Sequence, residues 1–199
     1  AQRRNSLGFD LSDVSQLANI GAQSQPPKAL SIQPIIVGSV KVGETQAILN
    51  PATGQAIGEV ITASQADVEQ ALEAACSWAS SQKHRSDVLR HAADLYEERH
   101  AEIFALLAAE AGKTLVDAVA ELREAVDFLR YYAAEAEGVS LPPRGLFVCI
   151  SPWNFPLAIF TGQIAAALAT GNAVIAKPAE TTPAIAAMAV KILHEAGVP

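Results

Sequence analysis

Cysteine, aromatic side chains and basic residues are all scarce in this chain of 199 residues. Two cysteines, Cys76 and Cys149, are too few for a disulfide framework or a cysteine-rich metal site. The 14 Lys and Arg against 21 Asp and Glu give a formal net charge of −7. That balance argues against a nucleic-acid-binding protein, because binding to phosphates requires basic patches. No apolar run approaches the roughly 18 residues of a membrane span, and no signal-peptide core follows the first residues. We therefore expect a cytoplasmic protein with no metal, nucleic acid or transmembrane segment.

Hydrophobic residues are abundant, at 50% of the chain, and many of them are alanine. The chain therefore has enough apolar surface for a core of close-packed helices, which excludes extensive disorder. We predict an N-terminal arm or linker over residues 1–30 and one larger unit over residues 31–199. Within that unit we expect a β-ribbon over 31–62, helices over 63–140, and alternating strands and helices over 145–199.

The first 62 residues contain one weak helix signal and several strand signals. A short helix is possible at about 12–20, and the arm ends in Gln25-Pro26-Pro27-Lys28, a stiff connector because proline fixes the backbone. Dense turn residues at 50–54 indicate a sharp reversal of the chain. We interpret the region as a two- or three-stranded antiparallel ribbon. Its strands are expected at 35–37, 46–49 and 57–61.

Three helices are predicted between the ribbon and the next strand. The first begins with Ser64 and Asp67, which resemble a capping box, the second spans 86–111 before Gly112, and the third spans 114–137. Apolar residues recur along each helix at the spacing of one buried face. The expected core contacts are Val68, Leu72, Ala75 and Ala79; Leu89, Ala92, Tyr96, Ile103, Phe104 and Leu107; and Leu115, Val119, Leu122, Val126, Leu129 and Ala133. The four histidines, His84, His91, His100 and His194, show no metal-ligand spacing, and we expect them at solvated helix positions.

After residue 144 the pattern changes to strand, helix, strand, helix. Residues 146–150 are a continuous apolar run, typical of a strand that is buried on both faces. A helix at about 157–170, a second strand at 173–176 and a helix at 183–196 follow. This order predicts an α/β fold, an incomplete Rossmann-like parallel sheet (βαβα) preceded by the ribbon and the three-helix segment. The sequence stops at Val198-Pro199, as if the winding of the sheet were interrupted.

The loops that follow the two parallel strands carry the candidate chemistry, because ligands in open α/β sheets bind beyond the carboxyl ends of strands. No G-x-G-x-x-G phosphate loop is present. In residues 151–156 two prolines fix the backbone, and Asn154 could donate a hydrogen bond to a developing oxyanion. In residues 177–180, Lys177 and Glu180 could bind the hydroxyls of a ribose. The alternatives are an Asn154 that bonds nearby backbone, a Trp153 in the core, and a surface ion pair.

Several motifs together are similar to the NAD(P)-dependent aldehyde dehydrogenase superfamily. They are ISPWNFPL at 150–157, GNAV at 171–174 and KPAETTP at 177–183, with NPATG at 50–54, EAGK at 110–113 and RYYA at 130–133 upstream. The likeness covers nearly everything from residue 45 to residue 199. Within the superfamily, CISPWNFPLAIFTGQ at 149–163 and RNSLGFDL at 4–11 most resemble the 1-pyrroline-5-carboxylate (L-glutamate γ-semialdehyde) dehydrogenase half of bifunctional proline utilization A.

The resemblance implies a role in proline catabolism, the oxidation of L-glutamate γ-semialdehyde to L-glutamate with NAD, as part of a larger, homo-oligomeric enzyme. FAD is implied only if that enzyme has a separate proline dehydrogenase domain. Asn154 is implied as the oxyanion donor, Phe155 as a wall of the aldehyde channel, and Glu121 as a partner of the substrate's α-ammonium group, with Glu124 one turn away as its rival. The implied NAD-binding residues are Ile150, Ser151, Pro152, Trp153, Lys177, Pro178, Ala179 and Glu180.

The sequence also departs from the family pattern. The nucleophilic cysteine, the general-base glutamate and the pyrophosphate loop of the family lie downstream of the matching segment. Cys149, in an apolar strand, and Cys76, on a helix beside Trp78, are interpreted as inert thiols. The link at 138–144 is short, and we expect it to lack part of the family's oligomerisation hairpin. We therefore expect the chain alone to be inactive. The alternatives are another semialdehyde or aldehyde dehydrogenase and, for the isolated chain, a non-catalytic nucleotide-binding or oligomerising module.

Overall fold

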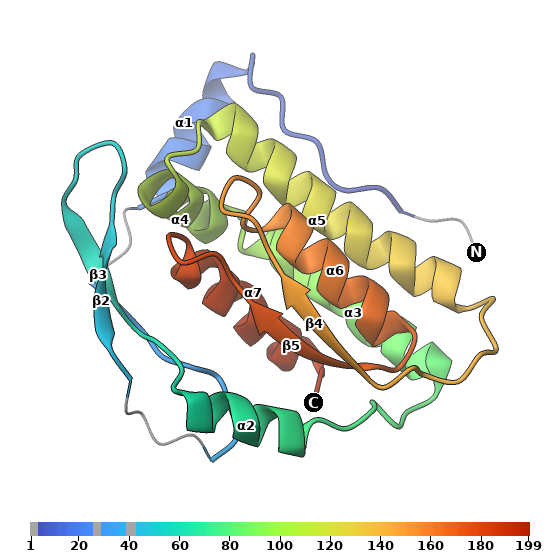
Figure 1. Ribbon diagram of the computed structural model, residues 1–199. Coiled ribbons are helices and arrows are strands. Elements are labelled where there is room, and N and C mark those ends of the chain that lie inside the picture. The colour runs from blue at the N-terminus through green and yellow to red at the C-terminus, as the bar shows by residue number, and fades with distance from the viewer. Residues whose placement is uncertain (1–3, 26–28, 39–42) are drawn as a thin grey trace.

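The computed structural model describes residues 4–25, 29–38 and 43–199 and shows a mixed α/β fold with two small sheets (Figure 1). Its elements, in chain order, are α1 (Val14–Gln23), β1 (Leu30–Ile32), β2 (Thr45–Leu49), β3 (Ala56–Ile61), α2 (Gln65–Ala74), α3 (Gln82–Glu98), α4 (His100–Ala111), α5 (Leu115–Ala136), β4 (Leu146–Ile150), α6 (Ala158–Ala169), β5 (Ala173–Lys177) and α7 (Pro183–Ala196). The predicted fold class is confirmed. The boundary between the arm and the larger unit stays a prediction, and the predicted Pro26-Pro27-Lys28 connector lies outside the described residues.

The first sheet has the strand order β1-β3-β2. β2 and β3 form the expected antiparallel pair, joined by the turn in which the Asn50 side chain accepts from Ala52 N (2.9 Å) and Gly54 adopts φ 69°. The strand predicted at 35–37 is wrong, because the third strand is β1, which ends two residues before Pro34 and pairs with β3 in parallel. That pairing requires Gly58, since a Cβ there would lie 2.4 Å from the Leu30 carbonyl oxygen.

The helical segment contains four helices within the described part of the chain, where three were predicted. The long helix expected at 86–111 begins earlier, at Gln82, and is divided at Arg99, whose φ of −93° and ψ of 20° leave the helical range. Next to the break, a ring nitrogen of His100 lies 2.9 Å from the Glu97 carbonyl oxygen. The ring of His100 also packs on Phe9 and Phe104, so the expectation of a solvated histidine is wrong at this position.

α2 begins as predicted and ends too early to bury the face predicted for it. Ser64 and Asp67 form the full capping box. The helix stops at Ala74, however, and Val68 and Leu72 are 45% and 48% exposed, so the expectation that they belong to the core is wrong. Cys76 consequently follows the helix instead of lying on it, and it is exposed.

The core lies around α5, which packs against α3 on one side and α6 on the other (Figure 1). The predicted stripe on α5 is confirmed, since Leu122, Val126, Leu129 and Ala133 are at most 1% exposed. Tyr96 on α3 is fully buried, and its hydroxyl lies 3.3 Å from Thr161 Oγ1 on α6. Burial raises the pKa of this phenol above its ordinary value, so the side chain stays neutral.

The arm is tied to α3 and α5 by charged and polar contacts. The guanidinium of Arg130 pairs with Glu97 (2.7 Å) and Asp94 (2.7 Å) and also donates to the Asn5 carbonyl oxygen (3.0 Å). Glu97 in turn accepts from Leu7 N (2.7 Å). Burial of Glu97 and Arg130 is tolerated because each has several partners. Residues 4–7 are therefore an integral part of this face of the molecule.

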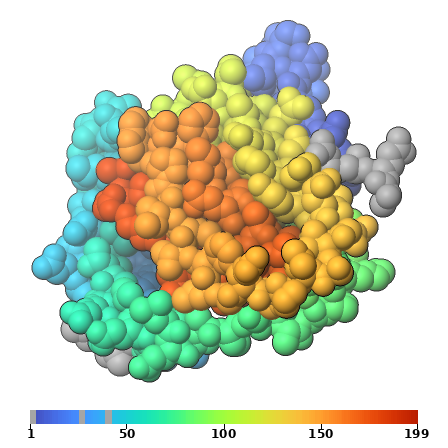
Figure 2. All heavy atoms as spheres, turned by 45° about the vertical axis from the view of Figure 1, so that its right-hand side comes forward, coloured from blue at the N-terminus to red at the C-terminus, as the bar shows by residue number. Residues whose placement is uncertain are grey.

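The second sheet consists of β4 and β5, paired in parallel as predicted. α6 packs against both strands from one side, and the opposite side of the sheet faces the viewer uncovered in Figure 1. The expectation that β4 is buried on both faces is therefore wrong. Cys149 is 6% exposed, whereas Phe147, Val148 and Ile150 are 43%, 55% and 65% exposed. The segment around β4 forms the orange area in the middle of the face shown in Figure 2.

Candidate functional site

The two loops predicted to carry chemistry lie side by side at one edge of the second sheet. In the parallel register Ile150 is the partner of Lys177, the last residue of each strand, and Ser151 N donates to the Lys177 carbonyl oxygen (3.1 Å). This register brings the predicted residues together in two short segments. They are Ile150, Ser151, Pro152, Trp153, Asn154 and Phe155 after β4, and Lys177, Pro178, Ala179 and Glu180 after β5.

Asn154 has an exposed side chain in a loop whose backbone is held. Its carbonyl oxygen accepts from Lys113 Nζ (2.7 Å), while its side-chain amide makes no hydrogen bond within the described residues. Trp153 beside it is 64% exposed, so it does not belong to the core. The amide is therefore free to donate to a ligand, and its role as an oxyanion donor stays a prediction.

Lys177 and Glu180 form a close ion pair at the end of β5, with side chains 46% and 77% exposed. The hydrogen bond from Lys177 holds the pKa of Glu180 below its ordinary value, so the carboxylate is ionised at neutral pH. An exposed carboxylate can accept hydrogen bonds from paired hydroxyl groups, and a neighbouring ammonium can donate hydrogen bonds to them. The same geometry is found in surface ion pairs, so the role at a ribose stays a prediction.

Glu121 is almost completely buried, at 2% exposure. Its Oε2 accepts from Leu157 N (3.2 Å) and Ala158 N (2.8 Å), the first backbone amides of α6, and its Oε1 pairs with Lys113 Nζ (3.0 Å). α6 has no capping side chain of its own, so Glu121 supplies the missing acceptor from another helix. A contact with a substrate ammonium stays a prediction, and it would require this ammonium to take the place of Lys113.

Glu110 repeats this arrangement at the other helix, and the sequence reasoning missed it. It is 2% exposed, and its two oxygens accept from Ala184 N (2.7 Å) and Ile185 N (2.9 Å) at the start of α7. Burial raises its pKa from 4.5 to about 7 despite these two bonds. The Thr182 side chain before Pro183 makes no cap bond, so Glu110 supplies the acceptors at this helix start. Buried carboxylates therefore anchor the helices behind both loops.

The loop residues offer hydrogen-bonding and aromatic groups of the kinds that would contact the ribose and nicotinamide portions of NAD. Ser151 Oγ and Thr182 Oγ1, one in each loop, are buried without a hydrogen-bond partner within the described residues. Ser24 Oγ and Ser80 Oγ, which lie outside both loops, are buried without a partner in the described ranges as well, so these hydroxyls do not by themselves mark a ligand site. Trp153 and Phe155 add exposed aromatic surface to the loop after β4.

The thiols and the metal-binding residue types do not add to the site. Cys149 is buried, and burial raises the pKa of its thiol, which disfavours the reactive thiolate. Among residues 4–25, 29–38 and 43–199, no group of three or more His, Cys, Asp or Glu side chains could hold a metal ion. In the same ranges no helix is both long enough and apolar enough to cross a membrane.

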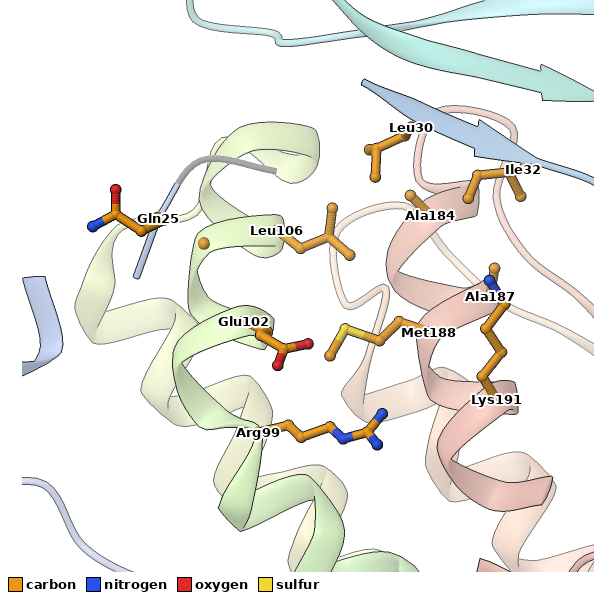
Figure 3. A pocket seen from close by; sticks show the side chains of 11 residues that line it. Gln25, Leu30, Ile32, Arg99, Glu102, Leu106, Ala184, Ala187, Met188 and Lys191 are labelled. Atoms are coloured by element: carbon orange, nitrogen blue, oxygen red, sulfur yellow. The ribbon is translucent and has the colours of Figure 1, made fainter. Parts of the chain in front are cut away.

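A cavity of about 340 Å³ lies away from the loops, between α4, α7 and β1 (Figure 3). Leu106 and Met188 extend toward each other across it, and Arg99 and Lys191 lie near one end. Arg99 is already paired with Glu195 (2.5 Å). None of the residues predicted for the site lines this cavity, so it is separate from the candidate chemistry.

The pattern of the aldehyde dehydrogenase family matches residues 38–199. The bifunctional protein PutA of Klebsiella aerogenes is 47% identical over 209 residues, which cover 99% of this chain and 16% of that protein. The 1-pyrroline-5-carboxylate dehydrogenase of Bacillus cytotoxicus is 38% identical over 83% of this chain and 37% of its own length. The structure of the Thermus 1-pyrroline-5-carboxylate dehydrogenase with bound NAD superposes with a TM-score of 0.85 at 33% identity, over 100% of this chain and 44% of the other. This chain thus spans less than half the length of each of these relatives.

Proposed function

The chain belongs to the aldehyde dehydrogenase family, and from this membership we propose that it forms part of an enzyme that oxidises L-glutamate γ-semialdehyde, the ring-opened form of 1-pyrroline-5-carboxylate, to L-glutamate with NAD. The names of its relatives and the NAD-bound Thermus structure support the substrate and the cofactor. The observation that carries the proposal is the free, exposed amide of Asn154 in a fixed loop beside the Lys177–Glu180 pair.

Bound NAD would supply the hydride acceptor for this chemistry, and the residues of this chain would hold and orient the cofactor. Lys177 and Glu180 bind the hydroxyls of the adenosine ribose, and Pro178 and Ala179 shape the same loop. The negative charge of Glu180 opposes a 2′-phosphate, so NAD is preferred over NADP. Ile150, Ser151, Pro152 and Trp153 line the nicotinamide side, next to Asn154.

Asn154 acts on the aldehyde oxygen. When a nucleophile adds to the carbonyl carbon, negative charge develops on that oxygen, and the Asn154 side-chain N–H stabilises it. Phe155 walls the path of the aldehyde. Neither Cys76 nor Cys149 has the surroundings of a nucleophile, so we expect the chain by itself to bind ligands without turning over substrate.

A second candidate function, a non-catalytic module that binds a nucleotide or associates with another chain, is favoured by one observation. The uncovered face of β4 exposes Val148 and Ile150, and exposed apolar strand surface promotes association. A measurement of NAD binding by the isolated chain distinguishes the two forms of this module, because only a nucleotide-binding chain would bind NAD.

Titration of the chain with NAD, followed by calorimetry and by Trp153 fluorescence, is expected to show saturable binding. Glu180→Gln should raise Kd by about 10-fold or more, because a charge-assisted hydrogen bond to the ribose is weakened. Glu98→Gln, at an exposed position on α3, removes the same charge elsewhere and should leave Kd unchanged. Absence of binding at millimolar NAD, or equal affinities in the two variants, would contradict the ribose role of Glu180.

Substrate preference tests the other part of the proposal. In the complete enzyme, kcat/KM for glutamate γ-semialdehyde should exceed that for succinate semialdehyde by about 100-fold or more. A site that pairs with the α-ammonium group leaves buried polar groups unpaired when that group is missing. Equal kcat/KM values for the two aldehydes would indicate a dehydrogenase of another substrate class.

A further inference from the structure

Lys113 occupies a position between α4 and α5 that is fixed by the backbone. Gly112 ends α4 with a φ of 66°, and Lys113 N donates back to the Leu107 carbonyl oxygen (3.2 Å). Pro51 lies close enough that a Cβ on Gly112 would approach it to 3.1 Å. The direction in which the Lys113 side chain leaves the helix is therefore determined by a tight turn rather than by a flexible loop.

The ammonium group of Lys113 is engaged by three groups at once. Its Nζ donates to the Asn154 carbonyl oxygen (2.7 Å), pairs with Glu121 Oε1 (3.0 Å) and lies 4.8 Å from the centroid of the Phe155 ring. The Lys113 side chain is 15% exposed and that of Glu121 is 1% exposed. Such shielding from solvent strengthens the ion pair, the hydrogen bond and the cation–π contact.

These contacts form a continuous connection across the loop that carries Asn154. Lys113 holds the middle of the loop through the Asn154 carbonyl oxygen. Glu121, the ion-pair partner of Lys113, holds the end of the loop through the first two amides of α6. A change at Lys113 therefore alters the support of Asn154 without removing any atom of its side-chain amide.

We propose that Lys113 is a positioning residue, which fixes the backbone of Asn154 so that the side-chain amide is directed at the reacting oxygen. This inference rests on the proposed function of Asn154. Lys113 donates to the backbone carbonyl of Asn154 and not to its side chain, so it acts on the side-chain amide through the backbone. Small displacements of a catalytic group reduce turnover strongly, so the ion pair with Glu121 gives the loop the rigidity that an oxyanion donor requires.

The first test measures the loop in this chain. In a Trp78→Phe background Trp153 is the single tryptophan, and its fluorescence anisotropy reports motion next to Asn154. Lys113→Met should lower the anisotropy while circular dichroism shows an intact fold, and Lys113→Arg, which keeps the charge, should recover most of the loss. Lys83→Met, which removes an exposed lysine paired with Asp87 on α3, serves as the matched control and should change nothing.

The second test measures turnover in the complete enzyme as a double-mutant cycle. Lys113→Met should lower kcat by about 10-fold or more and change KM for NAD much less, because the ribose partners Lys177 and Glu180 lie on the other loop. In an Asn154→Ala background the same substitution should cause almost no further loss, because Lys113 acts through Asn154. If the two substitutions lowered kcat independently, so that their effects multiplied in the double variant, the positioning role would be overturned.

The failure of this inference is distinguishable from failure of the proposed function. An unchanged kcat in Asn154→Ala contradicts the oxyanion role of Asn154. Unchanged Trp153 anisotropy in Lys113→Met overturns the positioning role even if Asn154→Ala is inactive. If Lys113→Met does not fold, Lys113→Gln is measured in both experiments, because its shorter, uncharged side chain also loses the contact with the Asn154 carbonyl oxygen.

Discussion

Asn154→Ala is expected to lower kcat of the complete enzyme by about 100-fold or more, because removal of one preorganised oxyanion donor has effects of this size. The loss should fall on kcat more than on KM for NAD, since the negative charge on the oxygen develops during the reaction. Steady-state kinetics with glutamate γ-semialdehyde measures both constants.

The structure supplies the controls for this variant. The Asn154 side chain is exposed and makes no hydrogen bond within the described part of the chain, so its truncation should leave the thermal midpoint unchanged. Asn19→Ala, at an exposed position on α1, should alter neither kcat nor the midpoint. An Asn154→Ala enzyme with normal kcat would show that the amide has no part in the reaction.

Glu110→Gln is expected to change how the stability of the chain depends on pH. Burial raises the pKa of Glu110 from 4.5 to about 7 in the folded state, whereas an unfolded chain titrates it near the ordinary value. The folded state therefore binds more protons between these two values, so the wild-type chain loses stability as pH rises through this window. The difference between the two pKa values corresponds to about 3 kcal/mol.

Urea denaturation followed by circular dichroism, at several pH values from about 5 to about 8, measures this effect. The unfolding free energy of the wild type, measured relative to that of Glu110→Gln, should fall by about 3 kcal/mol as pH rises across that range. The variant serves as the reference because glutamine does not titrate. Glu98→Gln on α3 is the exposed control and should run parallel to wild type. Parallel curves for Glu110→Gln and wild type would contradict the raised pKa of Glu110.

Features that depend on neighbouring residues in the chain could be predicted from the sequence. Ser64 with Asp67, Gly112 and Pro183 mark helix ends correctly, and the apolar spacing along α5 identifies its buried face. The two parallel strands were also correctly placed, and with them the two loops of the candidate site. Each of these signals is local, because caps, turns and helical faces are determined within a few residues.

Features that depend on distant residues could not be predicted. The pairing of β1 with β3 requires the close approach of Leu30 to Gly58, and the apolar pattern continues through the helix break at Arg99 without a sign of it. The apolar run of β4 does not tell which elements cover each face. The contacts of Lys113 with Asn154 join residues 41 positions apart, and motif spacing alone does not indicate them.

The two buried glutamates also have a consequence for the order in which the chain is made. Glu121 accepts from amides 36 and 37 residues later at the start of α6, and Glu110 accepts from amides 74 and 75 residues later in the first turn of α7. During synthesis on the ribosome, α4 and α5 emerge before the helices whose first amides they accept. α6 and α7 consequently acquire their N-terminal acceptors only when they dock onto α4 and α5, which couples completion of the two candidate loops to assembly of the helical core.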